Sequence, residues 1–479
     1  MRTLILLFLL NSFYSVYGQI NFFNLYTDNG DDFGEGIVQL EDSSFVITGS
    51  SSSFGWGSTD AFLLKIDSLG NYLWSKNYGG PESDGGRRVM YNPGDGFYVA
   101  GTTNSYGNGA YDFYLFKTDL SGNLIWERTY GGSGWERMND AVLTNDGGII
   151  MVGETSSNST QDRNSTLYKL NLNGDTLYTL HSQIIGTDYI SSITHYQDTL
   201  LSISGNCYLP DSSKWIGFVS TYHVNGGLIW GDTISINGDC FINDIVYSND
   251  MLYSVGSRNT LDNSSYGRLR IKHDLFGSVV SINTITSSVH YSDKDICEYG
   301  NTGDFIISFE YEDPSIPGNA TDLAIWKYSF PFTNQNQWTP VPFLNNDVIG
   351  QTIKTNDNSV VSVGSTSGYN QSFNNVFVSK IGPGSVFPNA TAPHNTQQLV
   401  ALTEDFYILI KLYPNPVSNI LNVSGDFDQL ESLVITDLKC KLVLSSNSKK
   451  IDVSELTQGV YITTIRTNKG TARKRLVIQ

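Results

Sequence analysis

Cysteine is scarce in this sequence of 479 residues, and its four cysteines do not stand at the spacings of a metal site. They are Cys207, Cys240, Cys297 and Cys440. None forms a Cys-x-x-Cys pair or has a histidine close by, which disfavours zinc. Four cysteines in so long a chain are also too few for a disulfide scaffold. One bridge among the first three is left open, whereas Cys440 is expected to stand alone in a different domain.

The familiar catalytic signatures are also missing. The six histidines are scattered, and none belongs to a His-Glu-x-x-His motif. There is no Gly-x-Ser-x-Gly elbow, no phosphate-binding Gly-x-x-x-x-Gly-Lys loop and no Gly-x-Gly-x-x-Gly fingerprint. These absences argue against a zinc protease, a serine hydrolase of the common type and a nucleotide-binding enzyme.

Positive charge is in short supply. The chain has 29 Lys and Arg against 47 Asp and Glu, for a net charge of −18. From Leu412 onward there are nine Lys and Arg against six Asp and Glu, so this end carries +3 and the rest carries −21. An acidic body argues against nucleic acid and against anionic membrane surfaces as partners. A solvated, soluble surface is enough to explain it.

Long apolar runs are absent except at the N-terminus. One Arg precedes an apolar run over Leu4–Leu10, and small residues follow up to Gly18. The run is too short to span a bilayer, so it predicts a secretory signal peptide over residues 1–18, cut between Gly18 and Gln19. A retained short anchor is the alternative. No Cys follows Gly18, which disfavours a lipoprotein.

What the chain does contain is a repeat of about 52 residues. DAFLLKIDSLGNYLWSKNYGG spans Asp60–Gly80, and DFYLFKTDLSGNLIWERTYGG spans Asp112–Gly132. The repeated Lys continues as Lys65, Lys117, Lys169, then Thr221 in its place, then Lys272, Lys327 and Lys380. A Gly that ends an apolar run recurs as Gly49, Gly101, Gly153, Gly205, Gly256 and Gly364, with Phe309 in its place in the sixth unit. Both markers therefore predict seven units.

Each unit contains four segments of strand character separated by turns rich in Gly, Ser, Asn and Asp. Seven four-stranded units of this length predict an all-β fold: a seven-bladed β-propeller over residues 19–387. Tyr26 lies 52 residues before Tyr78, in the register of a fourth strand, and the seventh unit lacks that strand. Residues 20–27 are therefore expected to pair into the last blade and close the ring.

The first two units resemble a blade repeat of secreted proteins from Bacteroidetes-type bacteria. The shared pattern is apolar-x-Lys-x-Asp-x-x-Gly-x-x-x-Trp followed by Tyr-Gly-Gly, seen here over Lys65–Gly80 and Lys117–Gly132. The match is partial in the third unit and weak in the last four. The resemblance implies a propeller fold and no particular activity.

The repeat stops near Phe387, and the polar residues 388–411 are predicted to be a linker. Residues 412–479 contain about seven short strands, which predict a small Ig-like β-sandwich. This segment resembles the type A C-terminal sorting domain of the type IX secretion system. The matching residues are Tyr413, Pro414, Asn415, Pro416, Gly459, Tyr461 and Lys474 within the basic last strand. Cys440 replaces a Gly that the family usually has.

That resemblance implies a route and a partner. The signal peptide would take the chain to the periplasm, and the secretion machinery would recognise the C-terminal domain and move the protein across the outer membrane. The domain is typically removed there, which leaves the passenger released or attached at the surface. We therefore expect a secreted or cell-surface protein with no membrane span.

No catalytic, cofactor-binding or metal-binding residue is predicted. The repeated Lys is expected on the blade periphery, with its stem packed and its ammonium group in water. Trp74, Trp126 and Trp230 are expected to pack neighbouring sheets. Asp28, Asp31, Asp32 and Glu35 lie close together in sequence and could hold a structural Ca²⁺, although Gly-Asp turns explain them equally well.

The sequence favours a non-catalytic propeller that binds an extracellular protein or glycan on one face of the ring. One alternative is an extracellular glycosidase or lyase on the same scaffold, and another is a structural surface component. An enzyme site would be sought in the fourth to sixth units, which depart most from the repeat. Their divergent features are Cys207, Trp215, Cys240, Phe309 and the loop Tyr311–Thr321.

Overall fold

The computed structural model describes residues 22–382, 395–398 and 411–479. Short gaps fall at 28, 54, 56, 158–161, 183–185, 260–265, 288–289, 300–303, 313–320, 330–332, 339–346, 368–372, 426, 428, 438–440 and 468–469. Gly18, Gln19, Asp28, Cys440 and most of the loop Tyr311–Thr321 therefore lie outside the described residues. The described chain is all-β, with 36 strands and one turn of 3-10 helix at Pro210–Ser212.

Six sheets of four antiparallel strands each follow one another along the chain. The first three sheets are β2 (Asp32–Gln39), β3 (Phe45–Ser51), β4 (Asp60–Ile66) and β5 (Tyr72–Tyr78); β6 (Asp84–Asn92), β7 (Gly96–Thr103), β8 (Asp112–Thr118) and β9 (Leu124–Tyr130); and β10 (Glu136–Thr144), β11 (Gly148–Thr155), β12 (Asn164–Asn171) and β13 (Thr176–His181). The next three are β14 (Asp188–Tyr196), β15 (Leu200–Leu209), β16 (Lys214–His223) and β17 (Leu228–Ile234); β18 (Asp239–Ser248), β19 (Met251–Asn259), β20 (Tyr266–Asp274) and β21 (Val279–Ser287); and β22 (His290–Tyr299), β23 (Asp304–Glu312), β24 (Thr321–Ser329) and β25 (Thr333–Trp338).

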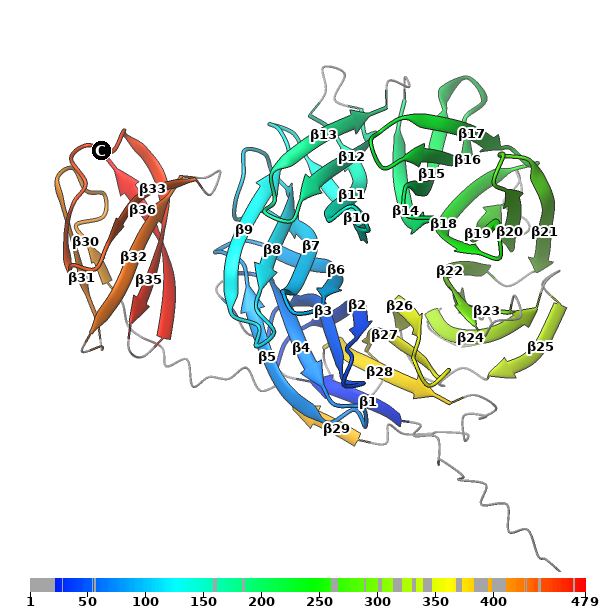
Figure 1. Ribbon diagram of the computed structural model, residues 1–479, viewed down its shortest axis with the longest axis horizontal. Coiled ribbons are helices and arrows are strands. Elements are labelled where there is room, and N and C mark those ends of the chain that lie inside the picture. Colours follow the sequence, from blue (N-terminus) through cyan, green and yellow to red (C-terminus); the bar gives the residue numbers. More distant parts are fainter. Residues whose placement is uncertain are drawn as a thin grey trace, which may run out of the picture.

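A further sheet joins both ends of the repeat region. Its strand order is β26 (Asp347–Lys354), β27 (Val360–Thr366), β28 (Asn375–Ile381), β1 (Phe22–Thr27) and β29 (Asn395–Gln398). Figure 1 shows these sheets arranged in a ring, with the first strand of each nearest the centre and the fourth at the outside. The arrangement is that of the blades of a β-propeller.

Strand β1 occupies the fourth-strand position of this last sheet, antiparallel to β28. Tyr26 donates its hydroxyl to the Gly70 carbonyl at 2.7 Å, in the neighbouring sheet. Tyr78 does the same to Gly122 at 2.6 Å, and Tyr130 to Gly174 at 2.7 Å. One hydrogen bond between sheets is thus repeated with the period of the sequence, and it includes the strand that comes from the N-terminus.

The recurring glycines that end an apolar run in each unit, such as Gly49 and Gly101, lie opposite a β-bulge. The first strand of each sheet shifts register once, and the shift pushes a carbonyl toward the second strand. A Cβ atom on Gly49 would lie 1.7 Å from the Phe33 oxygen, and one on Gly101 would lie 1.8 Å from the Gly85 oxygen. In the sixth sheet Phe309 is accommodated beside Asp293, and its ring packs 4.6 Å from the Arg268 guanidinium.

The prediction that the repeated Lys ends in water was wrong. In five of its six occurrences the ammonium group instead pairs with an Asp near the turn between the first and second strands of the same sheet, and in the fifth sheet the Lys272 ammonium lies over the Tyr253 ring, 5.4 Å from its centroid. The pairs are Lys65–Asp42 at 3.8 Å, Lys117–Asp95 at 2.5 Å, Lys169–Asp146 at 2.6 Å, Lys327–Asp304 at 2.8 Å and Lys380–Asp357 at 2.8 Å. Because the Lys169 side chain is only 2% exposed, its charge needs this partner.

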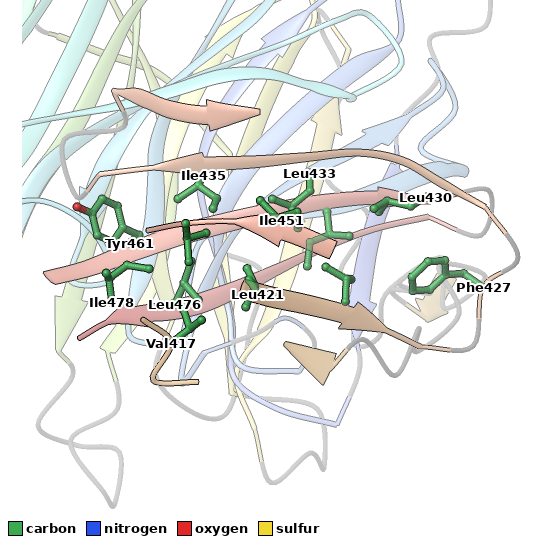
Figure 2. Packing of buried hydrophobic residues seen from close by; sticks show 13 residues of the cluster. Val417, Leu421, Phe427, Leu430, Leu433, Ile435, Ile451, Tyr461, Leu476 and Ile478 are labelled. Carbon is green, nitrogen blue, oxygen red and sulfur yellow. The ribbon is translucent and has the colours of Figure 1, made fainter. Parts of the chain in front are cut away.

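The C-terminal segment forms two sheets around one core. One sheet has the order β30 (Lys411–Tyr413), β31 (Ile420–Ser424) and β34 (Lys450–Asp452); the other has β33 (Leu442–Ser446), β32 (Leu430–Thr436), β35 (Gly459–Thr467) and β36 (Gly470–Ile478). Figure 2 shows Leu421 and Ile451 from the first sheet facing Leu433, Ile435 and Leu476 from the second. Alternating apolar residues on these short strands supply that core.

Candidate functional site

The bulges at the centre of the ring insert one residue at the same register position of every first strand, and six of the seven inserted residues have polar side chains. The inserted residues are Glu35, Arg87, Asn139, Ser191, Asn243, Lys294 and Gly350. Several of them reach the next sheet. Arg87 Nε donates to the Asn139 carbonyl at 3.0 Å, and Asn139 Nδ2 donates to the Ile190 carbonyl at 2.8 Å. The bulge position therefore links neighbouring sheets across the ring.

The residue after each bulge forms a second set of links. It is Gly36, Arg88, Asp140, Ser192, Asp244, Asp295 or Gln351 in the successive sheets. The carboxylate of Asp140 accepts from the Ile193 amide at 3.0 Å. Equivalent bonds join Asp244 to Ile296, Asp295 to Thr352 and Gln351 to Ile37, at 2.8, 2.8 and 2.9 Å. The last of these connects the seventh unit to the first.

Three buried carboxyl groups share this centre with one cation. Arg88 Nε donates to Asp140 Oδ1 at 2.7 Å. Ser192 Oγ lies 2.9 Å from Asp140 Oδ2 and 2.6 Å from Asp244 Oδ1. A hydroxyl has only one hydrogen to donate, so a proton on one of the two carboxyl groups is needed to satisfy both contacts. The centre is therefore built to hold at least one carboxyl group in its neutral form.

The pKa values agree with that geometry. Burial raises the pKa of Asp244 to about 6, and the nearby Asp140 adds to the effect. Burial and then Asp244 raise the pKa of Asp295 well above its ordinary value. Burial alone would lower the pKa of Arg88, but Asp140, Asp295 and Asp244 raise it. Removal of one negative charge should therefore favour the folded state.

We expect Asp244→Asn to stabilise the protein at pH 7.5 by about 2 kcal/mol, because Asp244 then carries a charge that the folded state disfavours. Folded Asp244 keeps its proton up to about pH 6, whereas an unfolded Asp loses it near pH 4. The folded state thus binds more protons in that window, so wild-type stability falls as the pH rises through it. Urea unfolding at pH 4 and pH 7.5 measures the difference.

The Asn amide can still accept from the Ile296 amide and donate to Ser192, but the Ile245 amide loses its 2.8 Å hydrogen bond to Oδ1. That loss costs about 1 kcal/mol against the roughly 2.7 kcal/mol gained by removing the charge. Glu82→Gln is the matched control, because it removes the same charge from an exposed side chain. An unchanged free energy of unfolding for Asp244→Asn at pH 7.5 would contradict the buried-charge interpretation.

A pocket of about 330 Å³ opens beside this centre, between the first three sheets. It is bounded by the ends of β3 and β7 and the starts of β6 and β10. Its charged side chains are Glu35, Asp84, Arg87 and Arg137, and its remaining side chains are hydroxyl-bearing apart from Met138. Gly85 and Gly86 leave its wall without side chains. This pocket is the candidate binding site.

The pocket holds more accessible positive than negative charge. Arg87 pairs with Glu35 at 2.8 Å, with both side chains about one-third exposed. Arg137 is exposed and lies opposite the buried Glu154 on β11. Burial raises the pKa of Glu154 while Arg163 and Arg137 lower it, and among the described residues the ion pair of Glu154 is with Arg163, at 3.4 Å. Glu35 raises the pKa of Arg87, but burial, Arg88 and Arg137 lower it below its ordinary value. Asp84 is buried and accepts from Ser105 Oγ and the Gly80 amide at 2.6 and 2.7 Å.

Of the acidic residues considered for Ca²⁺, the described ones each have a partner within the protein. Asp31 accepts from the Asn374 amide and side chain at 2.8 and 2.9 Å. Asp32 accepts from Ser51 and from Ser53 at 2.5 and 2.8 Å, while Glu35 pairs with Arg87. Within the described ranges, no three His, Cys, Asp or Glu side chains stand together as metal ligands.

In the fourth to sixth units, which depart most from the repeat, the residues considered for an enzyme site are used in packing. Cys207, Cys240 and Cys297 are free thiols, so the disulfide left open among them does not form. Burial raises the pKa of Cys240 to about 11, which makes its thiol inert. Trp215 packs against Tyr189, Tyr208 and Phe241.

Phe309 belongs to an aromatic cage. Phe309, Tyr291 and Trp326 surround the Arg268 guanidinium at 4.6 to 5.0 Å. The fully buried Arg270 beside it pairs with Asp293 at 2.8 Å. This cage joins the fifth and sixth sheets by cation–π contacts.

The residues that carry the sorting-domain resemblance lie in three stretches of the C-terminal segment, around Tyr413–Pro416, Gly459–Tyr461 and the last strand, and these stretches meet at one end of its sheets. Tyr413, Pro414, Asn415 and Pro416 are exposed at the end of β30, and the Tyr413–Pro414 and Asn415–Pro416 peptide bonds are cis. Asn415 Oδ1 accepts from the Val477 amide at 2.8 Å. Gly459 pairs with Ile478, Tyr461 with Leu476, and Thr463 with Lys474.

A family model described as the secretion system C-terminal sorting domain matches residues 411–479. Residues 411–479 are a type IX secretion sorting domain. The sorting domain makes this a secreted or cell-surface protein, which confirms the predicted localisation, and it implies an interaction with the secretion machinery. No helix in the described part of the chain is long and apolar enough to cross a membrane.

Solved structures with a similar chain course include two from surface-associated bacterial proteins. PorZ, a surface component of the type IX secretion system of Porphyromonas gingivalis, shares 14% identity at a TM-score of 0.41, over 94% of this chain and 59% of that one. The extracellular domain of BT3049 from B. thetaiotaomicron shares 12% identity at 0.40, over 96% and 57%. The Neurospora crassa Pan2 WD40 domain shares 13% at 0.42, over 75% and 98%.

These likenesses carry no functional argument at such scores. A search of curated proteins found no match to the chain. The propeller-like region is therefore interpreted from its own residues, and the pocket from its own geometry.

Sequence reasoning did not find the pocket or the carboxyl centre. Glu35, Arg87 and Asn139 are spaced at the 52-residue period, and so are Arg88, Asp140, Ser192 and Asp244. A column of charged and amide residues at one repeat position was therefore a usable signal. It was missed because the repeat was followed through its apolar, Gly and Lys positions.

Proposed function

We propose that residues 19–387 form a seven-bladed β-propeller, closed by β1, that binds an extracellular protein or glycan without chemical turnover. The observation that supports this most directly is the pocket of about 330 Å³ with exposed Arg137 at its edge. Its volume lies at the lower end of the range for small-ligand sites, about 300–1,000 Å³. Its polar lining supplies hydrogen bonds and charge, and the ring presents it at the surface.

The proposal includes the architecture of the chain. Seven successive sheets share one central polar network, and Gln351 connects the last to the first. After a linker over 388–411, residues 412–479 would form an Ig-like sandwich. Tyr461 supports that assignment, because its buried hydroxyl donates to the Thr457 carbonyl at 2.7 Å. This resembles the tyrosine corner of Ig-type folds.

An enzyme on the same scaffold would need carboxyl groups within reach of a substrate. Burial and the adjacent Glu136 raise the pKa of Asp112 to about 6, as a catalytic acid would require. Yet Asp112 is 1% exposed and Glu136 is fully buried, with Glu136 accepting from Thr155 and Gly132. Asp112 lines a second pocket of about 260 Å³, whereas Glu136 does not reach it. Glycoside hydrolysis needs two carboxyl groups beside the substrate, so this pocket with one of them favours binding over hydrolysis.

We expect the full chain to be retained on at least one member of a panel of polysaccharides and surface proteins, and to release no fragments over time. Gly85→Val should reduce that retention about tenfold or more, because the added atoms project into the pocket. A Cβ on Gly85 meets only the Ser50 Cβ, at the ordinary distance of 3.5 Å, so the fold should tolerate the change.

Gly227→Val is the matched control, since Gly227 lies in an exposed turn where a Cβ meets only Asn225 at 3.5 Å. Equal retention of the two variants would remove the pocket from the proposal. Steady release of fragments would favour the enzyme alternative, and a chain retained on nothing would favour a structural surface component.

A further inference from the structure

We infer that the pocket recognises an acidic saccharide, with the sugar carboxylate on Arg137 and the sugar hydroxyls on the surrounding Ser, Thr and Tyr side chains. This inference rests on the proposed binding function and names the ligand class for the same pocket. Arg137, Arg87, Glu35 and Tyr111 carry the argument.

The charge of the pocket selects an anion. Glu35 and the Asn139 carbonyl already take two donors of Arg87. Arg137 lies opposite Glu154 on β11, but Glu154 forms its ion pair with Arg163 at 3.4 Å, so the planar N–H donors of the exposed Arg137 can face the pocket. A carboxylate matches that fork with two parallel hydrogen bonds. Arg137 also lies close enough to Arg87 to lower its pKa, and an anion between the two groups would relieve their repulsion.

The rest of the lining favours a sugar over an acidic peptide. Ser50, Thr59, Ser83 and Thr102 present hydroxyl groups that can both donate and accept, as sugar hydroxyls do. Tyr111 adds the only aromatic face in the lining, and Glu35 an acceptor. Met138 is the sole aliphatic side chain of the wall, so a peptide would find no apolar pocket for an anchor residue. A volume of about 330 Å³ suits the end of a saccharide chain.

The test uses the full chain and three probes in calorimetric titration: trigalacturonate, its fully methyl-esterified form, and a hexapeptide of glutamate. We expect trigalacturonate to bind and its ester to bind about tenfold more weakly or worse, because a charge-assisted hydrogen bond is lost. Arg137→Gln should weaken trigalacturonate binding by about the same factor. Arg128→Gln is the control, since it removes the same charge from an exposed side chain on β9, outside the pocket.

Equal binding of the acid and its ester would overturn the acidic class and leave the binding function intact. If the glutamate peptide binds and trigalacturonate does not, the saccharide inference is overturned and the ligand is an acidic protein segment. Equal losses for Arg137→Gln and Arg128→Gln would assign the effect to net charge and overturn the pocket as its source. In the last outcome, none of the three probes binds, while a member of the panel still retains the wild-type chain and fails to retain Gly85→Val. In that case the ligand class is wrong and the proposed binding function stands.

Discussion

Deletion of residues 412–479 will keep the protein inside the cell envelope, with a loss of secreted protein of at least a hundredfold. The sorting domain is the part of the chain that the export machinery recognises, so nothing else is expected to replace it. The measurement is the amount of protein in the medium and on the cell surface, against the periplasm, in a bacterium with a type IX secretion system. Immunoblotting of the fractions gives the ratio.

The structure sharpens this experiment, because the sorting domain has its own core. Leu433 and Leu476 are fully buried in it, whereas Leu442 is 59% exposed. Leu433→Asp should block export as the deletion does, since a buried unpaired charge would unfold the domain. Leu442→Asp should leave export unchanged. Export of the deleted chain, or equal loss in both variants, would contradict the assignment of the route to this domain.

Deletion of Phe22–Thr27 will abolish cooperative folding of the propeller-like region. Phe22, Phe23, Leu25 and Tyr26 are all buried, and truncation of one buried Phe alone costs about 3–5 kcal/mol. A whole domain is stable by only about 5–15 kcal/mol. The deletion would also expose the edge of β28, which β1 covers. Size-exclusion chromatography and thermal unfolding should show aggregated or unfolded chains.

Single substitutions in β1 should lower the stability of the propeller-like region by smaller amounts than the deletion does. Phe23→Ala should cost about 3–5 kcal/mol, and Tyr26→Phe about 1 kcal/mol, because the latter loses only the hydrogen bond to Gly70. Leu73→Ala is the control on an outer strand, where the side chain is 49% exposed and the expected change is within about 0.5 kcal/mol. A deleted chain that melts at the wild-type temperature would show that β1 does not hold the ring together.

The sequence by itself determined the features that depend on local order. Alternating apolar residues and turn chemistry specified four strands per unit, and the markers at Gly and Lys specified where units begin. The blocks around Tyr413–Pro416 and Gly459–Tyr461 identified the sorting domain, because their residue types and their order can be read directly from the chain. These properties rest on residues that lie within one unit or one domain.

The tertiary structure decided which units face one another at the centre. Arg88, Asp140 and Asp244 come from three different sheets, and their shared electrostatics follows from the angle at which the ring places each sheet. The same holds for Arg87 and Arg137 in the pocket. It also decided that the Lys169 ammonium pairs with Asp146 and that the buried thiols stay apart. Side chains on different sheets are brought together by closure of the ring. The 52-residue spacing of Glu35, Arg87 and Asn139 marks one shared position, but it does not record which side chains meet there.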